Sequence, residues 1–369
     1  MFPLDLIKYP RKFSFLSTSG KFLTSNRRIK FIKIRANHSS SRSRSWSILF
    51  FGTDNFAVES LQKLHTKYNS QNAIKKLEVV VLPTAIENSV KKYAEKYNIK
   101  THTWPLKSQP SNFDLGVVVS FGRLIPTSII QSFPLGMINI HGSLLPKWRG
   151  AAPINHAIIN GDVETGVTVV KLMPKKYDIG DIIDQKKTPI HPDETFPQLC
   201  DRLAKIGSDL LLSTVQRLPD ILLLARPQRV EDVTYAPKLY PQMSIINWDA
   251  MSAKNIYNLQ RGLLNVYPLT TYFEANIIKL YNINLAETPK IQTPNEKPGF
   301  VIYSRKRKLL LVKCKDGQWI SVSNITVPGR RVMNALDFYN GYIAGRQKKS
   351  TCFNSNVNEI QKESICSVK

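Results

Sequence analysis

Two polar residues end an otherwise apolar run of the sequence. Asn139 and His141 lie two residues apart in the segment MINIH, 137–141. Because side chains alternate along a strand, both would point to the same face. Asp178 follows in YDIGD, 177–181, a glycine-containing turn. Open α/β sheets bind ligands outside the carboxyl ends of their strands, so an amide, an imidazole and a carboxylate could converge there.

These three groups suit acyl transfer to an amine. Asn139 could donate a hydrogen bond to a developing oxyanion, and His141 could move a proton or, when protonated, stabilise negative charge. Asp178 could orient or charge the histidine, or bind a water that shuttles protons. No Ser or Cys nucleophile is needed if the substrate brings its own amine. The alternative is structural: His141 bonds a loop carbonyl and Asp178 caps the turn.

The elements that must position these groups form an α/β domain over residues 47–225. Apolar runs predict buried strands at 47–52, 77–82, 115–119, 137–141 and 167–172. Apolar residues at helical spacing predict helices at 56–64, 89–97, 151–160 and 195–218. This order indicates a Rossmann-like, doubly wound, mainly parallel sheet covered on both faces. No glycine-rich phosphate-binding motif follows the first strand, so a nucleotide site of the usual kind is not predicted.

The pattern changes after residue 225. Residues 226–244 contain several prolines without periodicity and are predicted to be a linker. Residues 245–350 follow, with helices at 252–264 and 334–343 and short strands at 269–273, 277–283, 300–303, 309–312 and 319–322. Several short strands separated by turns predict a small β-barrel, and Asp316-Gly317 predicts a hairpin within it. Residues 351–369 are predicted to be a loose polar tail.

Positive charge is concentrated at two places. The chain carries 52 Lys and Arg against 27 Asp and Glu, a net charge of +25, which attracts polyanions. Residues 1–47 hold eleven of the basic residues and one acid, and are rich in serine. We therefore predict a mitochondrial transit peptide at 1–46 and location in the matrix, with a nucleic-acid-binding arm or a chloroplast leader as alternatives. Residues 245–350 hold sixteen basic residues and six acids.

Several functional classes are excluded by composition. No run of 18 apolar residues occurs, so no membrane-spanning helix or membrane partner is expected. The four cysteines have no CxxC spacing and the histidines no metal-binding spacing, so neither a disulfide scaffold nor a metal is expected. The basic run 305–308 is either a solvated turn or an RNA contact.

Four segments resemble the methionyl-tRNA formyltransferase family. NIHGSLLPKWRGAAPI, 139–154, resembles the family signature, and ILFFGTDNFA, 48–57, its opening strand and turn. VVVSFGRLIP, 117–126, is similar to its folate-pocket strand, and YDIGDII, 177–183, to its aspartate turn. The resemblance spans about residues 47–349 and implies a Rossmann-like domain joined to an OB-like barrel that contacts tRNA.

The resemblance also implies a reaction and its residues. The formyl group of 10-formyltetrahydrofolate passes to the amino group of methionyl-tRNA, giving formylmethionyl-tRNA for translation initiation in mitochondria. Asn139 and His141 would stabilise the oxyanion of the tetrahedral intermediate, and Asp178 would pair with His141 and assist proton transfer to the leaving folate nitrogen. Folate would be bound by Phe121, Gly122, Leu124, Ile125, Ser143, Leu144 and Pro146. Transfer RNA would be bound by Lys147, Arg149, Arg305, Lys306, Arg307, Lys308, Arg330 and Arg331.

One departure and two alternatives remain at this point. Bacterial members carry a long basic loop after the second strand, whereas here LPTAIEN, 82–88, leads to Lys91 and Lys92 on the next helix. How tRNA is selected is therefore open. A formyltransferase or hydrolase acting on a small-molecule amine is the nearest alternative, and the basic C-terminal third argues against it. A non-catalytic RNA-binding protein is the other, and the retained trio argues against it. We expect a monomer.

Overall fold

The computed structural model describes residues 44–70, 73–83, 88–274, 276–290, 296–344 and 352–355. The predicted transit peptide lies outside these ranges apart from its last three residues, of which Trp46 already begins the first strand. Of the predicted loose tail, only residues 352–355 are described. They bridge to Tyr272 and Phe300, and Phe353 is 1% exposed, so this part of the tail is packed.

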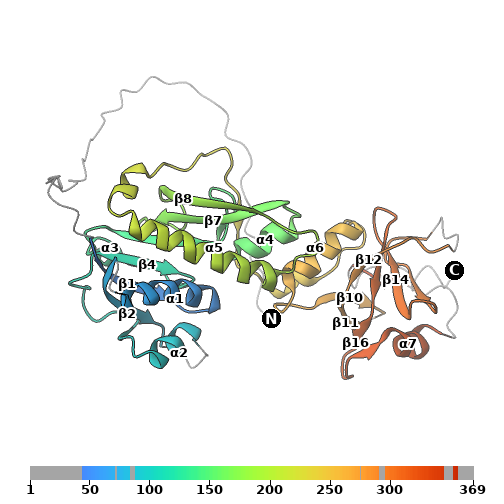
Figure 1. Cartoon of the computed structure of the whole chain (residues 1–369). Coiled ribbons are helices and arrows are strands. Elements are labelled where there is room, and N and C mark those ends of the chain that lie inside the picture. Colours follow the sequence, from blue (N-terminus) through green and yellow to red (C-terminus); the bar gives the residue numbers. More distant parts are fainter. Residues whose placement is uncertain are drawn as a thin grey trace, which may run out of the picture. The chain divides into compact units, whose positions relative to one another are not determined.

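A large sheet forms the N-terminal domain (Figure 1). Within the described residues its spatial order is β3 (Thr101–Thr103), β2 (Ile74–Val81), β1 (Trp46–Gly52), β4 (Leu115–Val119), β5 (Met137–His141), β7 (Glu164–Lys171) and β8 (Ile182–Pro189). The strands from β3 to β5 pair in parallel, whereas β7 and β8 are antiparallel. The predicted Rossmann-like, mainly parallel sheet is thereby confirmed.

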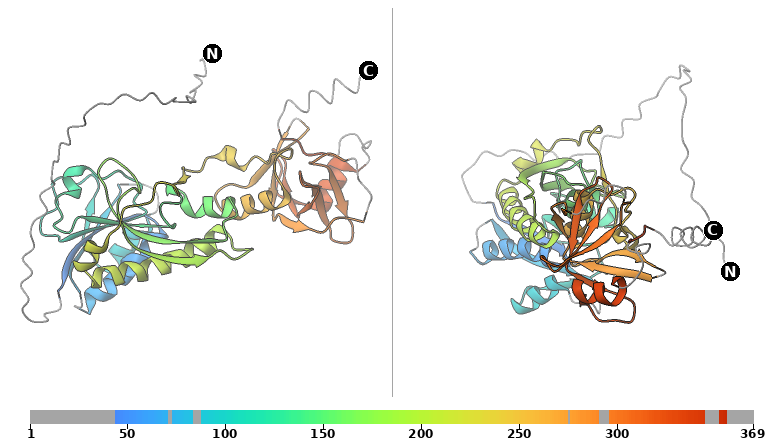
Figure 2. Two further views of the ribbon diagram at one scale, coloured as in Figure 1. Left: turned by 90° about the horizontal axis from the view of Figure 1, so that it is seen from above. Right: turned by 90° about the vertical axis from the view of Figure 1, so that its right-hand side faces the viewer.

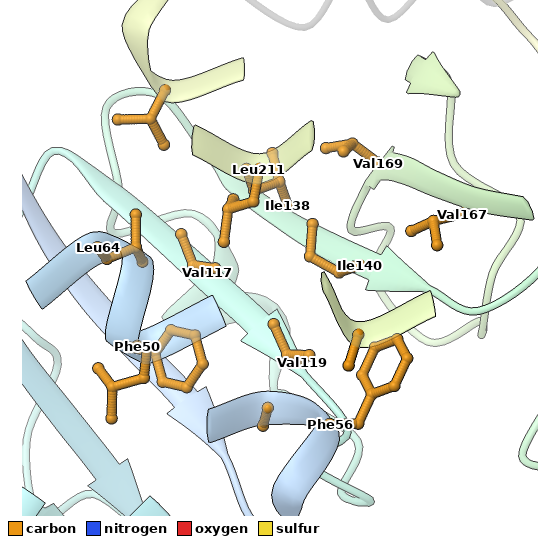
Figure 3. Close-up of a cluster of buried hydrophobic side chains, with 14 of the residues drawn as sticks. Phe50, Phe56, Leu64, Val117, Val119, Ile138, Ile140, Val167, Val169 and Leu211 are labelled. Atoms are coloured by element: carbon orange, nitrogen blue, oxygen red, sulfur yellow. The ribbon is translucent and has the colours of Figure 1, made fainter. Parts of the chain in front are cut away.

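Both faces of this sheet are buried, which explains why its strands lack polar alternation. Figure 3 shows one face, where strand residues pack against helices α1 (Asn55–Asn69) and α5 (Phe196–Gln216) through Phe50, Val117, Ile138, Leu64 and Leu211. The two helices run side by side (Figures 1 and 2). The alternate strand residues, such as Leu49, Phe51 and Val118, form a second core on the other face of the sheet, together with Phe121 after β4. Short helices complete the domain: α2 (Ser89–Lys96), α3 (Thr127–Ile130) and α4 (Pro153–Ile159).

The connection between the domains is irregular. It contains the 3-10 turns Asp220–Leu224 and Pro241–Ser244 and the short strand β9 (Tyr235–Ala236). This strand pairs in parallel with β6 (Arg149–Gly150), which belongs to the segment after β5. The predicted linker is therefore tied to the signature segment.

The C-terminal domain is built from antiparallel β-structure (orange and red in Figure 2). Helix α6 (Ala253–Leu263) precedes two sheets that each have four strands among the described residues. One is β10 (Leu269–Phe273), β11 (Asn276–Tyr281), β16 (Asn324–Thr326) and β17 (Met333–Asn334); the other is β12 (Asn284–Ala286), β15 (Trp319–Val322), β14 (Leu309–Lys313) and β13 (Val301–Ser304). The predicted hairpin joins β14 to β15, and Gly317 adopts φ +76° there.

Several elements differ from the sequence prediction, among them the short strands β3, β6, β9, β12, β16 and β17 and helix α3, which were not predicted. The helix predicted at 334–343 is helix α7 (Ala335–Phe338) followed by a π-helical turn, Tyr339–Ile343. Strand β8 was not predicted, because it has polar residues on its exposed positions and lies at the sheet edge. In the described part of the chain, no helix is both long and apolar enough to cross a membrane.

Candidate active site

A cavity of about 550 Å³ opens at the carboxyl ends of the parallel strands. Strands β1, β4 and β5 are neighbours in the sheet, and residues at or just after their ends line the cavity. The chain runs outward from β1 to β2 and β3 in one direction and from β4 to β5 in the other. The boundary between β1 and β4 is therefore the topological switch point, where open α/β sheets bind ligands.

Asn139, His141 and Asp178 come together in this cavity. The Asn139 Nδ2 donates to Asp178 Oδ1 over 3.3 Å, and His141 Nδ1 lies 3.5 Å from the same oxygen. The His141 and Asp178 side chains are only 5% and 11% exposed. Strand alternation explains the arrangement, because Ile138 and Ile140 enter the core of Figure 3 while Asn139 and His141 point away from it.

The position of Asp178 is fixed from both sides. Its Oδ2 accepts a hydrogen bond of 3.1 Å from the Gly150 backbone N–H. Gly150 has a φ of +127°, and a Cβ at this position would lie 2.5 Å from the Ala236 carbonyl oxygen, so only glycine fits. Gln228 donates to the carbonyl oxygens of Asp178 and Gly180, 2.8 and 2.9 Å away. Residues from the signature segment and the linker therefore hold the carboxylate in place.

His141 also has a partner on its other ring nitrogen. Nε2 donates to the Trp148 carbonyl oxygen over 2.9 Å. A carbonyl can only accept, so Nε2 carries a hydrogen, while Nδ1 faces Asp178. The structural alternative, in which His141 bonds a loop carbonyl, is thus part of the arrangement, and it coexists with the carboxylate contact.

Similarity to known proteins agrees with this site. Residues 47–215 match the formyl transferase family model, and residues 238–343 match the formyl transferase C-terminal domain. The chain is 38% identical over 315 residues to the mitochondrial methionyl-tRNA formyltransferase of Mus musculus, covering 83% of this chain and 81% of that protein. It is 39% identical over 307 residues to the mitochondrial methionyl-tRNA formyltransferase of Homo sapiens, covering 81% of this chain and 78% of that protein. The chain belongs to the methionyl-tRNA formyltransferase family.

A solved structure supports the fold of this formyltransferase. The N-formyltransferase from Helicobacter canadensis, in complex with folinic acid and dTDP-3-aminofucose, has a TM-score of 0.56 and 20% sequence identity. The match covers 75% of this chain and 98% of that one. At this identity the likeness concerns the fold alone.

The residues predicted to bind folate separate into two groups. Phe121, Gly122, Leu124 and Ile125 follow β4 and line the same cavity as the trio. Ser143, Leu144 and Pro146 do not line it; the fully buried Ser143 hydroxyl donates to the Lys147 carbonyl, 2.6 Å away. In this formyltransferase the second group shapes the loop between β5 and β6.

The residues predicted to bind tRNA lie on the surface and outside the cavity lining. Lys147 is exposed, whereas Arg149 is half-buried and donates to Gln228 Oε1 over 2.9 and 2.7 Å. Residues 305–308 form the exposed turn between β13 and β14, in which Arg307 pairs with Glu287. Arg330 and Arg331 occupy a second exposed turn, after β16.

Several cavity residues were not singled out from the sequence. Asp54 lines the cavity and also caps α1, because its Oδ1 accepts from the Ala57 backbone N–H. Cys200 of α5 lines the same cavity; burial above all, and then the charge of Asp54, raises its thiol pKa to about 12. The thiol stays protonated at neutral pH and is a poor nucleophile. No local pattern could have placed this helix residue near Asp54.

Among the described residues, no group of three or more His, Cys, Asp or Glu side chains could hold a metal ion. Residues 84–87, in the LPTAIEN segment after the second strand, lie outside the described residues. Lys92, just beyond them, belongs to helix α2.

Proposed function

We propose that this chain transfers the formyl group of 10-formyltetrahydrofolate to the amino group of methionyl-tRNA in the mitochondrial matrix. The trio of Asn139, His141 and Asp178 around one oxygen atom of the carboxylate carries this proposal. The named mitochondrial relatives support the acceptor and the compartment. The product, formylmethionyl-tRNA, serves translation initiation.

In this reaction the trio acts on charge that develops at the formyl group. Asn139 uses one amide hydrogen on Asp178, which leaves the second free to donate to the formyl oxygen as it becomes negative. His141, which lies against the same Asp178 oxygen, would help to stabilise that oxyanion. Asp178 then assists proton transfer to the folate nitrogen that leaves.

The cavity suits the formyl donor. Its wall after β4 is apolar and includes Phe121 and Ile125, which matches a flat ring system, while the trio lies at its polar end. Ser143, Leu144 and Pro146 would support this site from the loop behind it. Exposed Lys147, Arg305, Lys306, Arg307, Lys308, Arg330 and Arg331, with Arg149 at the signature segment, would contact the tRNA.

A small amine acceptor is the less favoured reading. The sixteen basic residues of 245–350 would not be needed to bind a small acceptor, but they could bind the phosphate backbone of a tRNA. The deciding experiment incubates the protein with 10-formyltetrahydrofolate and either methionyl-tRNA or free amino sugar nucleotides. Formylmethionine released from the tRNA is expected, and transfer to the nucleotide alone would overturn the proposal.

The leader makes a separate prediction. Residues 1–45 carry ten more basic than acidic side chains and should direct a fluorescent reporter to the matrix. The chain without them should keep its activity in vitro, because the first strand begins at Trp46. A cytosolic or nuclear reporter signal would contradict the predicted transit peptide.

A further inference from the structure

Asp54 occupies the switch point of the sheet, but the reaction outlined above does not use it. It follows β1 by two residues, next to the end of β4, where the Thr53 hydroxyl donates to the Ser120 carbonyl over 2.5 Å. Asp54 and Ser120 both line the cavity that contains the catalytic trio. The carboxylate therefore lies where the topology directs a ligand.

The two carboxylates of the cavity differ in their surroundings. Both oxygens of Asp178 accept from protein donors, and His141 Nδ1 lies 3.5 Å from one of them. Asp54 accepts from the backbone N–H groups of Ala57 and Phe56, from its own N–H and from the Ser120 hydroxyl, but no described cation pairs with it. The residue is exposed to the cavity, yet protein surrounds its carboxylate, and this burial raises its pKa. A cation entering the cavity would supply the positive charge that the Asp54 carboxylate lacks.

The wall around Asp54 fits an apolar group attached to such a cation. Phe56, Ile154, Phe196 and Cys200 line this part of the cavity, and the charge of Asp54 acts on the Cys200 thiol. That thiol remains neutral, so it neither competes for the cation nor attacks the formyl group. An ammonium beside an unbranched thioether side chain, as in an esterified methionine, has both features.

We propose that Asp54 binds the α-ammonium group of the aminoacyl ester and accepts one of its protons. This rests on the proposed function and adds a residue on the acceptor side. The ammonium and the carboxylate become a neutral amine and a carboxylic acid, which returns its proton to water. The amine's lone pair is then free to attack the formyl carbon. The raised pKa favours this transfer.

The same contact distinguishes substrate from product. Formylation converts the amine into an uncharged amide, which cannot pair with a carboxylate. Asp54 then loses its cation while still partly surrounded by protein, and this weakens the binding of the product. The residue would thus select tRNA that has not been formylated.

The test compares two esters on one tRNA in the absence of folate. One carries methionine; the other carries the hydroxy-acid analogue of methionine, in which a hydroxyl replaces the ammonium. At about pH 6, where an α-amino group is protonated, the wild type should bind the methionine ester roughly 10-fold more tightly. In Asp54→Asn this preference should vanish. An unchanged preference in that variant would overturn the inference.

The variant is chosen to keep the fold. Asparagine caps helices as well as aspartate, so α1 can retain its bond to Ala57, and Asp54→Ser offers a second capping side chain. Asp209→Asn is the matched control, since it removes an exposed carboxylate on α5 that pairs with Lys63. Losing negative charge alone strengthens the binding of both esters, so the preference should stay at the wild-type value.

Two further measurements separate this inference from the proposed function. The affinity for formylmethionyl-tRNA should rise relative to methionyl-tRNA in Asp54→Asn. If the wild type makes no formylmethionyl-tRNA, the proposed function fails. If it does and Asp54→Asn leaves both affinity ratios unaltered, only the role of Asp54 fails.

Discussion

Charged groups are held very differently in the cavity of Asn139, His141 and Asp178 and on the C-terminal domain. Asp178 is 11% exposed and binds protein donors through both oxygens. Residues 305–308 lie in an exposed turn, and only Arg307 has an ion pair there among the described residues. Stabilising a transition state requires fixed positions, whereas attracting a phosphate backbone requires only charge within reach. Substitutions should therefore have large, coupled effects at the first place and small, additive, salt-dependent effects at the second.

The largest effect is expected when a member of the trio Asn139, His141 and Asp178 is removed. Changing Asn139, His141 or Asp178 to Ala should each lower kcat by roughly 10²-fold or more, because each loss disturbs the groups around one carboxylate oxygen. The double variants should lose less than the product of the single effects. Steady-state kinetics with saturating substrates measures this, and thermal unfolding checks the fold.

Asp181→Ala is the matched control for Asp178. The Asp181 side chain is 47% exposed, three residues further along, and lies 4.0 Å from Lys171 Nζ. Its removal should leave kcat near the wild-type value. Turnover at the wild-type rate in His141→Ala would show that the trio is not the catalytic unit.

A smaller effect, confined to tRNA, is expected when the charge of the basic turn 305–308 is reversed. Glutamate at Arg305, Lys306, Arg307 and Lys308 should raise the KM for methionyl-tRNA by on the order of 10-fold and flatten its dependence on salt, because fewer counterions are released. The KM for folate should not change, since none of the four residues lines the cavity. Initial rates across a salt series give both quantities.

The second basic turn provides the alternative path. Reversing Arg330 and Arg331 tests whether tRNA follows that turn instead, together with Arg346, Lys348 and Lys349, which lie outside the described residues. If neither set of changes affects tRNA kinetics, the C-terminal domain does not bind tRNA. Recognition would then fall to the N-terminal domain.

The smallest expected effect concerns a buried ion pair at the sheet edge. Burial alone would raise the pKa of Glu78, but the 2.5 Å bond from His102 and the charges of Lys76 and Lys100 outweigh it and lower that pKa. Glu78 thus adds stability above its ordinary pKa of 4.5, and this is lost as pH falls through the lower value of the folded state. Glu78→Gln should lower Tm by roughly 2 °C near neutral pH, about 1 kcal/mol, and by less in acid.

The exposed pair in the basic turn is the control for this prediction. Glu287 is 85% exposed in its pair with Arg307, so Glu287→Gln should leave Tm unchanged, because solvent screens such pairs. Thermal unfolding of both variants over a pH series measures these effects. Equal changes in Tm would mean that burial does not distinguish the two ion pairs.

The sequence predicted the elements best where their pattern was complete. The strands at 115–119, 269–273 and 319–322 have the predicted bounds, because each is an apolar run bounded by polar or turn residues. Strand β8 was missed because an edge strand with one open face has no continuous apolar run. The C-terminal helix was predicted as one element, although its second half is a π-helical turn.

For the site, the sequence by itself determined which groups share a face, and the tertiary structure decided which faces meet. Asn139 and His141 point the same way because a strand alternates with a period of two. Asp178, 39 residues after Asn139, Gln228 in the linker, and Asp54 after β1 reach this cavity only because strand order and loop paths bring them there. Spacing along a chain encodes local direction, whereas distance between elements depends on how the whole sheet is ordered and packed.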